Sequence, residues 1–353
     1  ARGTYIFPPE AGLKLSSDVI DYCARSGLTS WTPLAMSGYH IRDSGSTAVQ
    51  EVAFTFSNAI SYVKAALDSG LNVDDFASRL SFFFVAQSDI MEEIAKFRAA
   101  RRMWAKIMKK RFGAKKSKSL KLRFHTQTAG VTLTAQQPEN NVVRTTLQAL
   151  AAVLGGTQSL HCNAKDEALA LPTEESGTIA LRTQQILLHE SGVTNTVDPM
   201  GGSYAIEHLT DTIEREATAL LQHIDKLGGT LAAIESGFIQ RSIQDAAYEA
   251  QQAIDSKEAV VVGVNKYTAD DKPHSSVFRV DPSLEREQID RLRQVRASRS
   301  KSAWTAALKA VETAATDGKN LVPSIIEAVE RHATLGEISD ALRGVFGEHR
   351  DIS

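Results

Sequence analysis

Short segments of apolar or alternating residues are interspersed with longer amphipathic segments over the first 200 residues of the chain. The short segments predict four strands, at residues 33–40, 79–85, 120–128 and 157–163. Apolar residues at helical spacing predict intervening helices near residues 49–69, from residue 89, near 141–154 and near 178–190. One helix between consecutive strands, with strand starts about every 40 residues, is typical of βα units in a parallel sheet.

After the turn-rich segment Asp198–Gly202 the pattern becomes mainly helical. We predict helices near residues 210–227 and 230–256, a short strand at 259–264, and helical stretches from Ser283 onward. Alternating charges along these helices favour a wrapping or linking region over a second catalytic domain. The sequence therefore predicts two domains, residues 1–200 and residues 201–353.

One face of several predicted strands is polar. Because strand side chains alternate in direction, residues 120–128 direct Leu122 and Phe124 to one side and His125 and Gln127 to the other. Parallel strands covered on both faces are normally continuous aliphatic runs. A barrel whose axis holds a long polar ligand would explain an enclosed polar face, since buried polar groups need partners. An open sheet with one solvated face explains the same pattern equally well.

Polar side chains also gather where we expect the predicted strands to end, namely His40, Arg79, His125, Gln127 and His161. Barrel enzymes build their active sites at the C-terminal ends of their strands. Four strands cannot close a barrel of the (β/α)8 class, which needs eight. The sequence therefore predicts an α/β fold that contains half of such a barrel.

Composition narrows the functional classes. The 40 Lys and Arg residues nearly balance the 42 Asp and Glu residues, which argues against a nucleic-acid partner. The basic segment 106–123 is better explained as a helix C-terminus followed by a solvated loop. No apolar run approaches the roughly 20 residues that a membrane helix needs, so we expect no membrane partner. Cys23 and Cys162 match no disulfide framework or CxxC motif, which favours a reducing, cytoplasmic compartment.

Histidine spacing does not favour a metal centre. The sequence contains neither HxH nor HExxH, so we predict no metal ligands. A metal-dependent barrel hydrolase using His40, His125 and His161 is a remote alternative. GxSxG, GxGxxG and P-loop motifs are also missing from the sequence, which removes the signatures of serine hydrolases, dinucleotide enzymes and NTPases.

Several longer segments together resemble one family. They are ARGTYIFPPE, SGYHIRDSGSTAVQEVAFT, RLSFFF, EIAKFRAARRMWAKIM, RFHTQTAGVTLTAQQPENNVVRT, GGTQSLHCNAKDEALALPT, VDPMGGSY and VVGVNKY, in this order along the chain. In these segments the chain resembles the large subunit of the methylmalonyl-CoA mutase family, which are adenosylcobalamin (vitamin B12)-dependent acyl-CoA mutases. The resemblance implies a (β/α)8 TIM barrel with coenzyme A threaded along its axis. It also implies that the chain begins near the end of the fourth barrel strand and continues through the last four strands into a helical linker.

The resemblance assigns substrate contacts to particular residues. Arg2 matches the arginine that pairs with the free carboxylate of the substrate and also lies near the cofactor, and a guanidinium suits a planar carboxylate. Tyr39 and His40 match the catalytic pair over the reacting carbons, with the histidine bonded to the thioester carbonyl. Arg79 and Ser81 match coenzyme A contacts.

The resemblance also implies a cavity lining and a cofactor contact surface. His125 and Gln127 match residues that line the substrate cavity. Gly130, Glu167 and Ala170 match positions that touch the cobalamin or its adenosyl group. The DxHxxG motif that supplies the lower cobalt ligand does not occur in this sequence, so a separate cobalamin-binding domain or small subunit is the implied partner. A dimer or heterodimer is the implied assembly.

The implied activity is a radical isomerisation of the carbon skeleton, interconverting (R)-methylmalonyl-CoA and succinyl-CoA. The chain departs from the family pattern at Val131, Met200 and Ser30. A related mutase acting on isobutyryl-, 2-hydroxyisobutyryl- or ethylmalonyl-CoA is the nearest alternative. A partner protein that keeps the fold without catalysis is a third, opposed by the presence of His40, Gln127 and Glu167.

Overall fold

The computed structural model describes residues 6–269 and 277–349, and the contacts within it divide the chain into two compact units. Of the described residues, the first unit comprises 35–60, 80–269 and 277–279. The second comprises 6–34, 61–79 and 280–349. The predicted domain boundary near residue 200 stays a prediction.

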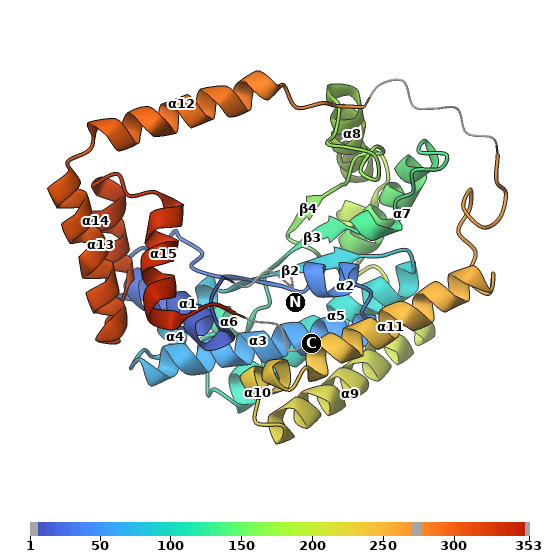
Figure 1. Ribbon diagram of the computed structural model, residues 1–353. Coiled ribbons are helices and arrows are strands. Elements are labelled where there is room, and N and C mark those ends of the chain that lie inside the picture. The colour runs from blue at the N-terminus through green and yellow to red at the C-terminus, as the bar shows by residue number, and fades with distance from the viewer. Residues whose placement is uncertain (1–5, 270–276, 350–353) are drawn as a thin grey trace. The chain divides into compact units, whose positions relative to one another are not determined.

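A parallel four-stranded sheet forms the centre of the first unit (Figure 1). Its strands, in spatial as well as chain order, are β1 (Ala35–Ser37), β2 (Ser81–Ala86), β3 (Phe124–Thr128) and β4 (Ser159–His161). The register places Phe83 opposite His125, and Gln127 opposite His161. The parallel βα pattern is confirmed. The strand predicted at 259–264 is wrong, because that segment contains only an isolated bridge between Val262 and Lys266.

The strands are shorter than the predicted ones, and the largest difference lies after β1. Tyr39 and His40 do not lie on a strand but begin the short helix α2 (Tyr39–Asp43). The turn comes at Gly38, whose backbone is already helical at φ −85° and ψ −22°. A Cβ at Gly38 would lie 2.5 Å from Thr55 Oγ1, so only glycine fits there without a shift of its neighbours.

Helices follow each strand of the first unit. They are α3 (Ala48–Asp68), α5 (Ile90–Lys110), α6 (Ser117–Leu120), α7 (Asn140–Leu154), α8 (Glu174–His189), α9 (Tyr204–Lys226), α10 (Thr230–Glu235) and α11 (Phe238–Asp255). The Asp89 carboxylate caps α5 by accepting from the amides of Met91 and Glu92, at the position where the sequence predicted this helix to begin. The helix predicted over 230–256 is interrupted at Gly237, which adopts a left-handed conformation at φ 70°.

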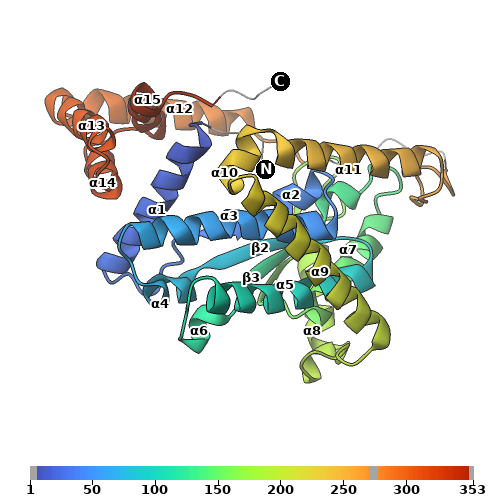
Figure 2. The same ribbon diagram turned by 90° about the horizontal axis from the view of Figure 1, so that it is seen from below.

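An aromatic core joins the sheet to α3 and α5, which lie on the same face of β2 and β3 (Figure 2). The ring of Phe82 lies 5.6 Å from that of Phe56 and 4.8 Å from that of Trp104. Phe97 stacks on Phe124 at 5.2 Å. All five side chains are buried, so the predicted apolar face of the strands is confirmed.

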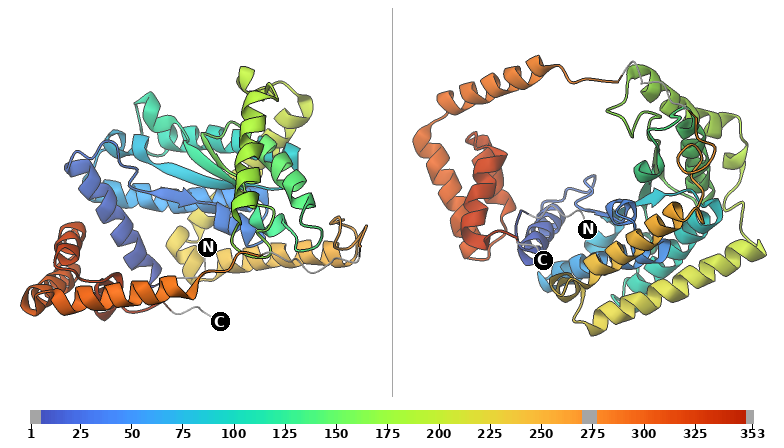
Figure 3. Two further views of the ribbon diagram at one scale, coloured as in Figure 1. Left: turned by 90° about the horizontal axis from the view of Figure 1, so that it is seen from above. Right: turned by 45° about the vertical axis from the view of Figure 1, so that its right-hand side comes forward.

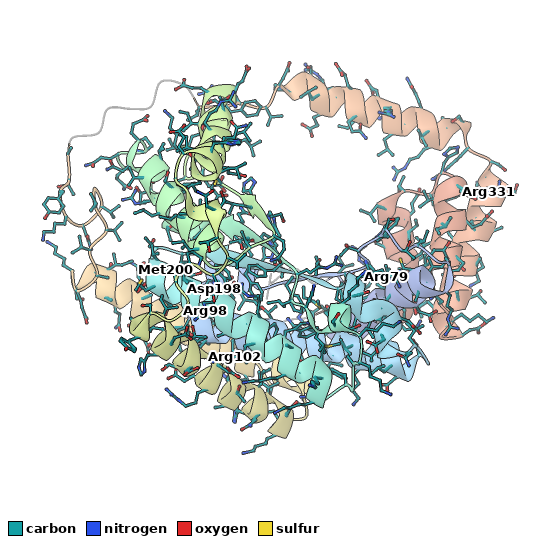
Figure 4. The ribbon with its side chains drawn as sticks, turned by 180° about the vertical axis from the view of Figure 1, so that it is seen from behind. Arg79, Arg98, Arg102, Asp198, Met200 and Arg331 are labelled. Carbon is teal, nitrogen blue, oxygen red and sulfur yellow. The ribbon has the colours of Figure 1, made fainter. Side chains whose placement is uncertain are left out.

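Ion pairs join α5 to α9, which runs beside it (Figure 3). Arg98 pairs with Asp198 at 3.0 Å and with Glu207 at 2.8 Å (Figure 4). Lys106 and Arg111, from the basic segment, pair with Glu214 and Asp225 respectively. Part of that segment therefore serves packing within the chain.

The second unit is helical, with α1 (Pro9–Arg25), α4 (Val73–Phe76), α12 (Pro282–Ser298), α13 (Lys301–Thr316), α14 (Val322–Glu330) and α15 (Leu335–Phe346). Val311, Leu321 and Leu342 belong to its apolar core. The helices predicted after Ser283 are confirmed. In the part of the chain that the structure describes, no helix is both long enough and apolar enough to span a membrane.

Candidate functional site

The hydroxyl group of Tyr39 is the meeting point of three chain segments at the C-terminal edge of the sheet. Gln127 Nε2, near the end of β3, donates to this oxygen at 3.2 Å, and the amide of Gly130 lies 3.4 Å from it. Gln127 Nε2 also donates to Asn163 Oδ1 at 2.8 Å, just after β4. These bonds bring Tyr39 and Gln127, two of the predicted site residues, into contact, and their roles stay predictions.

Asp43 shares this position and was missed by sequence reasoning. Its carboxyl group accepts a hydrogen bond from the Tyr39 hydroxyl. Burial raises the pKa of Asp43, and burial followed by the charge of Asp43 raises the pKa of Tyr39. The phenol therefore stays protonated at neutral pH and serves as a fixed hydrogen-bonding group rather than a base.

Asn163 was also missed as a site residue. Its side chain accepts from Gln127 and donates from Nδ2 to the carbonyl of Thr128 at 2.8 Å, and its amide donates to Thr128 Oγ1. These bonds tie the end of β4 to the end of β3. The only sequence signal for it was its place on the predicted polar face with Ser159 and His161.

Phe83 forms an aromatic platform under the predicted catalytic pair. Its ring stacks on Tyr39 at 4.9 Å with an interplanar angle of 9°. His125 lies 5.2 Å away, and the His40 ring meets Phe83 edge-on at 6.1 Å. These four half-exposed rings therefore lie on the side of the sheet opposite the aromatic core, where the alternation predicted polar residues.

Each of two histidines is oriented by a serine. Ser37 Oγ and His40 Nδ1 are 2.8 Å apart, and Ser159 Oγ and His125 Nδ1 are 2.7 Å apart. Such a bond fixes the plane of an imidazole ring, whichever atom donates. His161, the last residue of β4, is exposed.

The stability of the protein is expected to depend on His125 between about pH 7 and pH 5. Burial, and then the nearby His161, lower the pKa of His125 below the unfolded value of 6.5. The unfolded chain therefore takes up this proton first, so His125 reduces stability as pH falls through 6.5. His125→Gln should show a smaller loss of unfolding free energy than the unaltered protein in urea titrations at pH 7, 6 and 5. Equal losses would contradict the assignment.

The predicted cofactor contacts lie in the loops that follow β3 and β4. Gly130 begins a 3₁₀ turn (Gly130–Thr132), and a Cβ there would come within 3.2 Å of the Tyr39 hydroxyl and 3.3 Å of Asn163 Nδ2. Glu167 is exposed in the turn after β4, and Ala170 is half-buried in the same turn. Their contact with a cofactor stays a prediction.

The predicted coenzyme A contacts are placed differently. Arg79 does not stand at the C-terminal end of a strand as predicted, because it ends the 3₁₀ turn that precedes β2. Its guanidinium donates to the carbonyls of Leu28 at 2.8 Å and Asp75 at 3.0 Å, and it is labelled in Figure 4. Ser81 is the half-buried first residue of β2. Arg2 lies outside the described residues.

The three histidines of the hydrolase alternative have other partners or positions. His40 bonds to Ser37 and His125 bonds to Ser159, whereas His161 is exposed at a sheet edge. Among the residues with described positions, no group of three or more His, Cys, Asp or Glu side chains is arranged to hold a metal ion.

The fold and this site define a class of protein, an α/β protein of parallel βα units with hydrogen-bonded phenol, amide and imidazole groups at its strand ends. Comparison makes the assignment specific: over residues 1–348 the chain matches methylmalonyl-CoA mutase, and it belongs to that family. The family domain is of the TIM-barrel type, so the predicted relation of the four strands to such a barrel is confirmed.

Three relatives illustrate the match. The chain is 47% identical to methylmalonyl-CoA mutase of Escherichia coli over 99% of its own length and 49% of the relative. It is 46% identical to the 2-hydroxyisobutanoyl-CoA mutase large subunit of Aquincola tertiaricarbonis, over 99% of the chain and 63% of the relative. It is 42% identical to mitochondrial methylmalonyl-CoA mutase of Homo sapiens, over 99% and 47%. The chain thus spans about half the length of most of these relatives.

Proposed function

We propose that the chain forms part of an isomerase that interconverts (R)-methylmalonyl-CoA and succinyl-CoA with adenosylcobalamin as cofactor. The convergence of Tyr39, Gln127 and Asn163 at the ends of three βα units carries this proposal. These groups and the adjacent Gly130 lie where barrel enzymes bind their reacting partners. Family membership supplies the reaction class.

The residues present fit such a cofactor in their chemistry. Near the ends of β3 and β4, the Tyr39 phenol and the exposed Glu167 carboxylate suit the hydroxyl and amide groups of adenosylcobalamin. Gly130 lacks a side chain that would cover the Tyr39 hydroxyl, so the approach to these groups is open on that side. We propose that Gly130, Glu167 and Ala170 hold the cofactor, with Arg2 near it.

Bound adenosylcobalamin would supply a carbon radical through homolysis of its cobalt–carbon bond, chemistry that no side chain provides. The task of the protein is then to bind, orient and shield. We propose that His40, oriented by Ser37, donates a hydrogen bond to the thioester carbonyl, and that the stacked pair of Tyr39 and Phe83 covers the reacting carbons and excludes water. His125 and Gln127 would line the cavity, and Arg79 and Ser81 would contact coenzyme A.

The acyl group of the substrate has two candidates. Relatives of nearly equal similarity are named for two different acyl groups, methylmalonyl and 2-hydroxyisobutanoyl. The similarity to the second relative favours a branched-acyl mutase as the alternative. A match of Arg2 to the carboxylate-binding arginine favours the dicarboxylic substrate.

We call this chain together with the remaining barrel strands and the cobalamin-binding part the assembled mutase. Turnover by the assembled mutase tests the proposal. We expect conversion of (R)-methylmalonyl-CoA to succinyl-CoA, and slower or no conversion of isobutyryl-, 2-hydroxyisobutyryl- and ethylmalonyl-CoA. Chromatography of the thioesters measures this directly. Conversion of the 2-hydroxyisobutyryl ester alone would establish the alternative.

Arg2→Gln provides the control on specificity. Because an arginine pairs with a carboxylate in two parallel hydrogen bonds, the substitution should weaken dicarboxylic substrates selectively. Equal losses on all thioesters would remove Arg2 from the specificity site. We further propose that the cobalamin-binding part is a domain or small subunit, in a dimer or heterodimer, and that the protein works in the cytoplasm.

A further inference from the structure

Strand β2 continues beyond the point at which β1 ends. The register stops at Ser37 opposite Phe83, and the amide of Gly38 donates to the carbonyl of Phe83 at 2.7 Å. Alternate residues of a strand bond to opposite neighbours, and the carbonyl of Ala86 accepts from Ala129 on the β3 side. The amide and carbonyl of Val85 therefore point to the β1 side of the sheet. At this position β1 has ended and the chain has turned into α2.

Two buried charged side chains take the place of the missing strand. Glu51 Oε1, from α3, accepts from the amide of Val85 at 3.0 Å. Lys96 Nζ, from α5, donates to the carbonyl of Val85 at 2.7 Å and to Glu51 Oε2 at 2.6 Å. Both side chains are 0% exposed. The ion pair thus satisfies both backbone groups that would otherwise be buried without partners.

The same charges lead to the helix that bears the proposed catalytic pair. Lys96 also bonds to Glu93, which is fully buried. On the other side of Glu93 lies Arg42 of α2, with its Nη2 3.6 Å from Glu93 Oε1 and 3.0 Å from Glu92 Oε2. The path runs from the backbone of β2 through α3 and α5 to α2.

We propose that Glu51, Lys96, Glu93 and Arg42 are positioning residues that hold α2, and with it Tyr39 and His40, against the end of β2. Removing four charges from water costs free energy, and the attraction between the charges can be smaller than this cost. A contribution to stability is therefore a weak explanation for their presence here. Helix α2 has five residues and no side-chain cap at its N-terminus. A helix this short is held by its surroundings rather than by its own hydrogen bonds.

The catalytic part of this inference rests on the function proposed above, and its structural part does not. Arg42→Met in the assembled mutase removes the cation at the α2 end and leaves the bonds of Val85, Glu51 and Lys96 in place. We expect amide hydrogen exchange in residues 39–43 to rise about tenfold or more, while exchange in residues 142–153 of α7 stays unchanged. We expect kcat for the acyl-CoA substrate to fall between about tenfold and 100-fold, with KM changed less than about threefold.

Two matched variants separate positioning from general destabilisation. Arg42→Lys keeps a cation that reaches the Glu92 carboxylate, and it should restore most of kcat. Arg299→Met removes an equally buried arginine that pairs with Glu337 at 2.6 Å in the second unit. It should lower the melting temperature without lowering kcat.

The outcomes decide between the two proposals. Unchanged exchange in residues 39–43 of Arg42→Met, or an equal loss of kcat in Arg299→Met, would overturn the positioning role. If the unaltered mutase converts none of the acyl-CoA esters, the proposed function fails. The exchange measurement then still decides whether the charges hold α2.

Discussion

Replacing Lys96 with methionine is expected to lower the free energy of unfolding by about 3–5 kcal/mol at pH 7. The methionine side chain fills a similar volume but leaves the carbonyl of Val85 without a donor. It also leaves Glu51 and Glu93, both fully buried, without the cation between them. Urea unfolding of the full chain measures the loss, and a change below about 1 kcal/mol would contradict the account.

The pH dependence of this deficit identifies its cause. Burial raises the pKa of Glu51, and Lys96 is the main group that opposes the rise. Without Lys96, the pKa of Glu51 in the folded chain lies above its pKa in the unfolded chain, so folding is accompanied by uptake of a proton. The stability of Lys96→Met should therefore increase as pH falls from 7 toward 5. A deficit that stays constant would show that lost packing, rather than a buried charge, is responsible.

A second substitution tests the backbone role of the pair. In Glu51→Gln combined with Lys96→Met, the side-chain amide offers an acceptor for the Val85 amide and a donor for its carbonyl. The double variant should thus be more stable than Lys96→Met alone. This reversal distinguishes a site that requires hydrogen bonds from one that requires charge.

The pattern of the sequence could predict the βα succession because the apolar face of each strand packs on helices whose own apolar positions recur at helical spacing. Phe82 and Phe124 alternate with Phe83 and His125 along their strands, and the two sets do lie on opposite faces. Periodicity could not predict that β1 would stop at Ser37. That turn depends on the close approach of Thr55 to Gly38, a contact between residues far apart in the chain.

The charged network escaped prediction for a different reason. Glu51 lies in a stretch of α3 that is buried on nearly all sides, where the assumption of one apolar and one solvated face fails. A glutamate there resembles an ordinary solvated position of an amphipathic helix. Its partner Lys96 is equally inconspicuous between the core residues Ala95 and Phe97. Only the three-dimensional position of the Val85 backbone explains both.

The site was predicted in part because strand ends are recognisable in the sequence. Gln127 was placed correctly near the end of β3. Arg79 was not, since residues 77–79 form a 3₁₀ turn that carries it to the beginning of β2. Asp43 carried no signal, because its contact with Tyr39 depends on helix α2, whose first two residues the sequence predicted as strand.

On the function proposed above, replacing His40 with alanine is expected to lower kcat of the assembled mutase by about 100-fold to 1,000-fold, the cost of removing one oriented donor at a polarised carbonyl. The imidazole bonds to Ser37 and lies perpendicular to the Phe83 ring, so its orientation is fixed before substrate binds. KM should change far less than kcat, because a hydrogen bond that strengthens as the carbonyl gains charge acts mainly in the transition state. Steady-state kinetics with (R)-methylmalonyl-CoA measure both constants.

Ser37→Ala is the matched control for that substitution. It keeps the imidazole but removes the 2.8 Å bond that orients it, so we expect a loss of kcat of about tenfold, well short of that of His40→Ala. If His40→Ala raised KM and left kcat unchanged, His40 would serve only to bind the thioester. Equal losses of kcat in the two variants would instead mean that a misoriented imidazole contributes nothing to kcat. Orientation by Ser37 would then account for the whole contribution of His40.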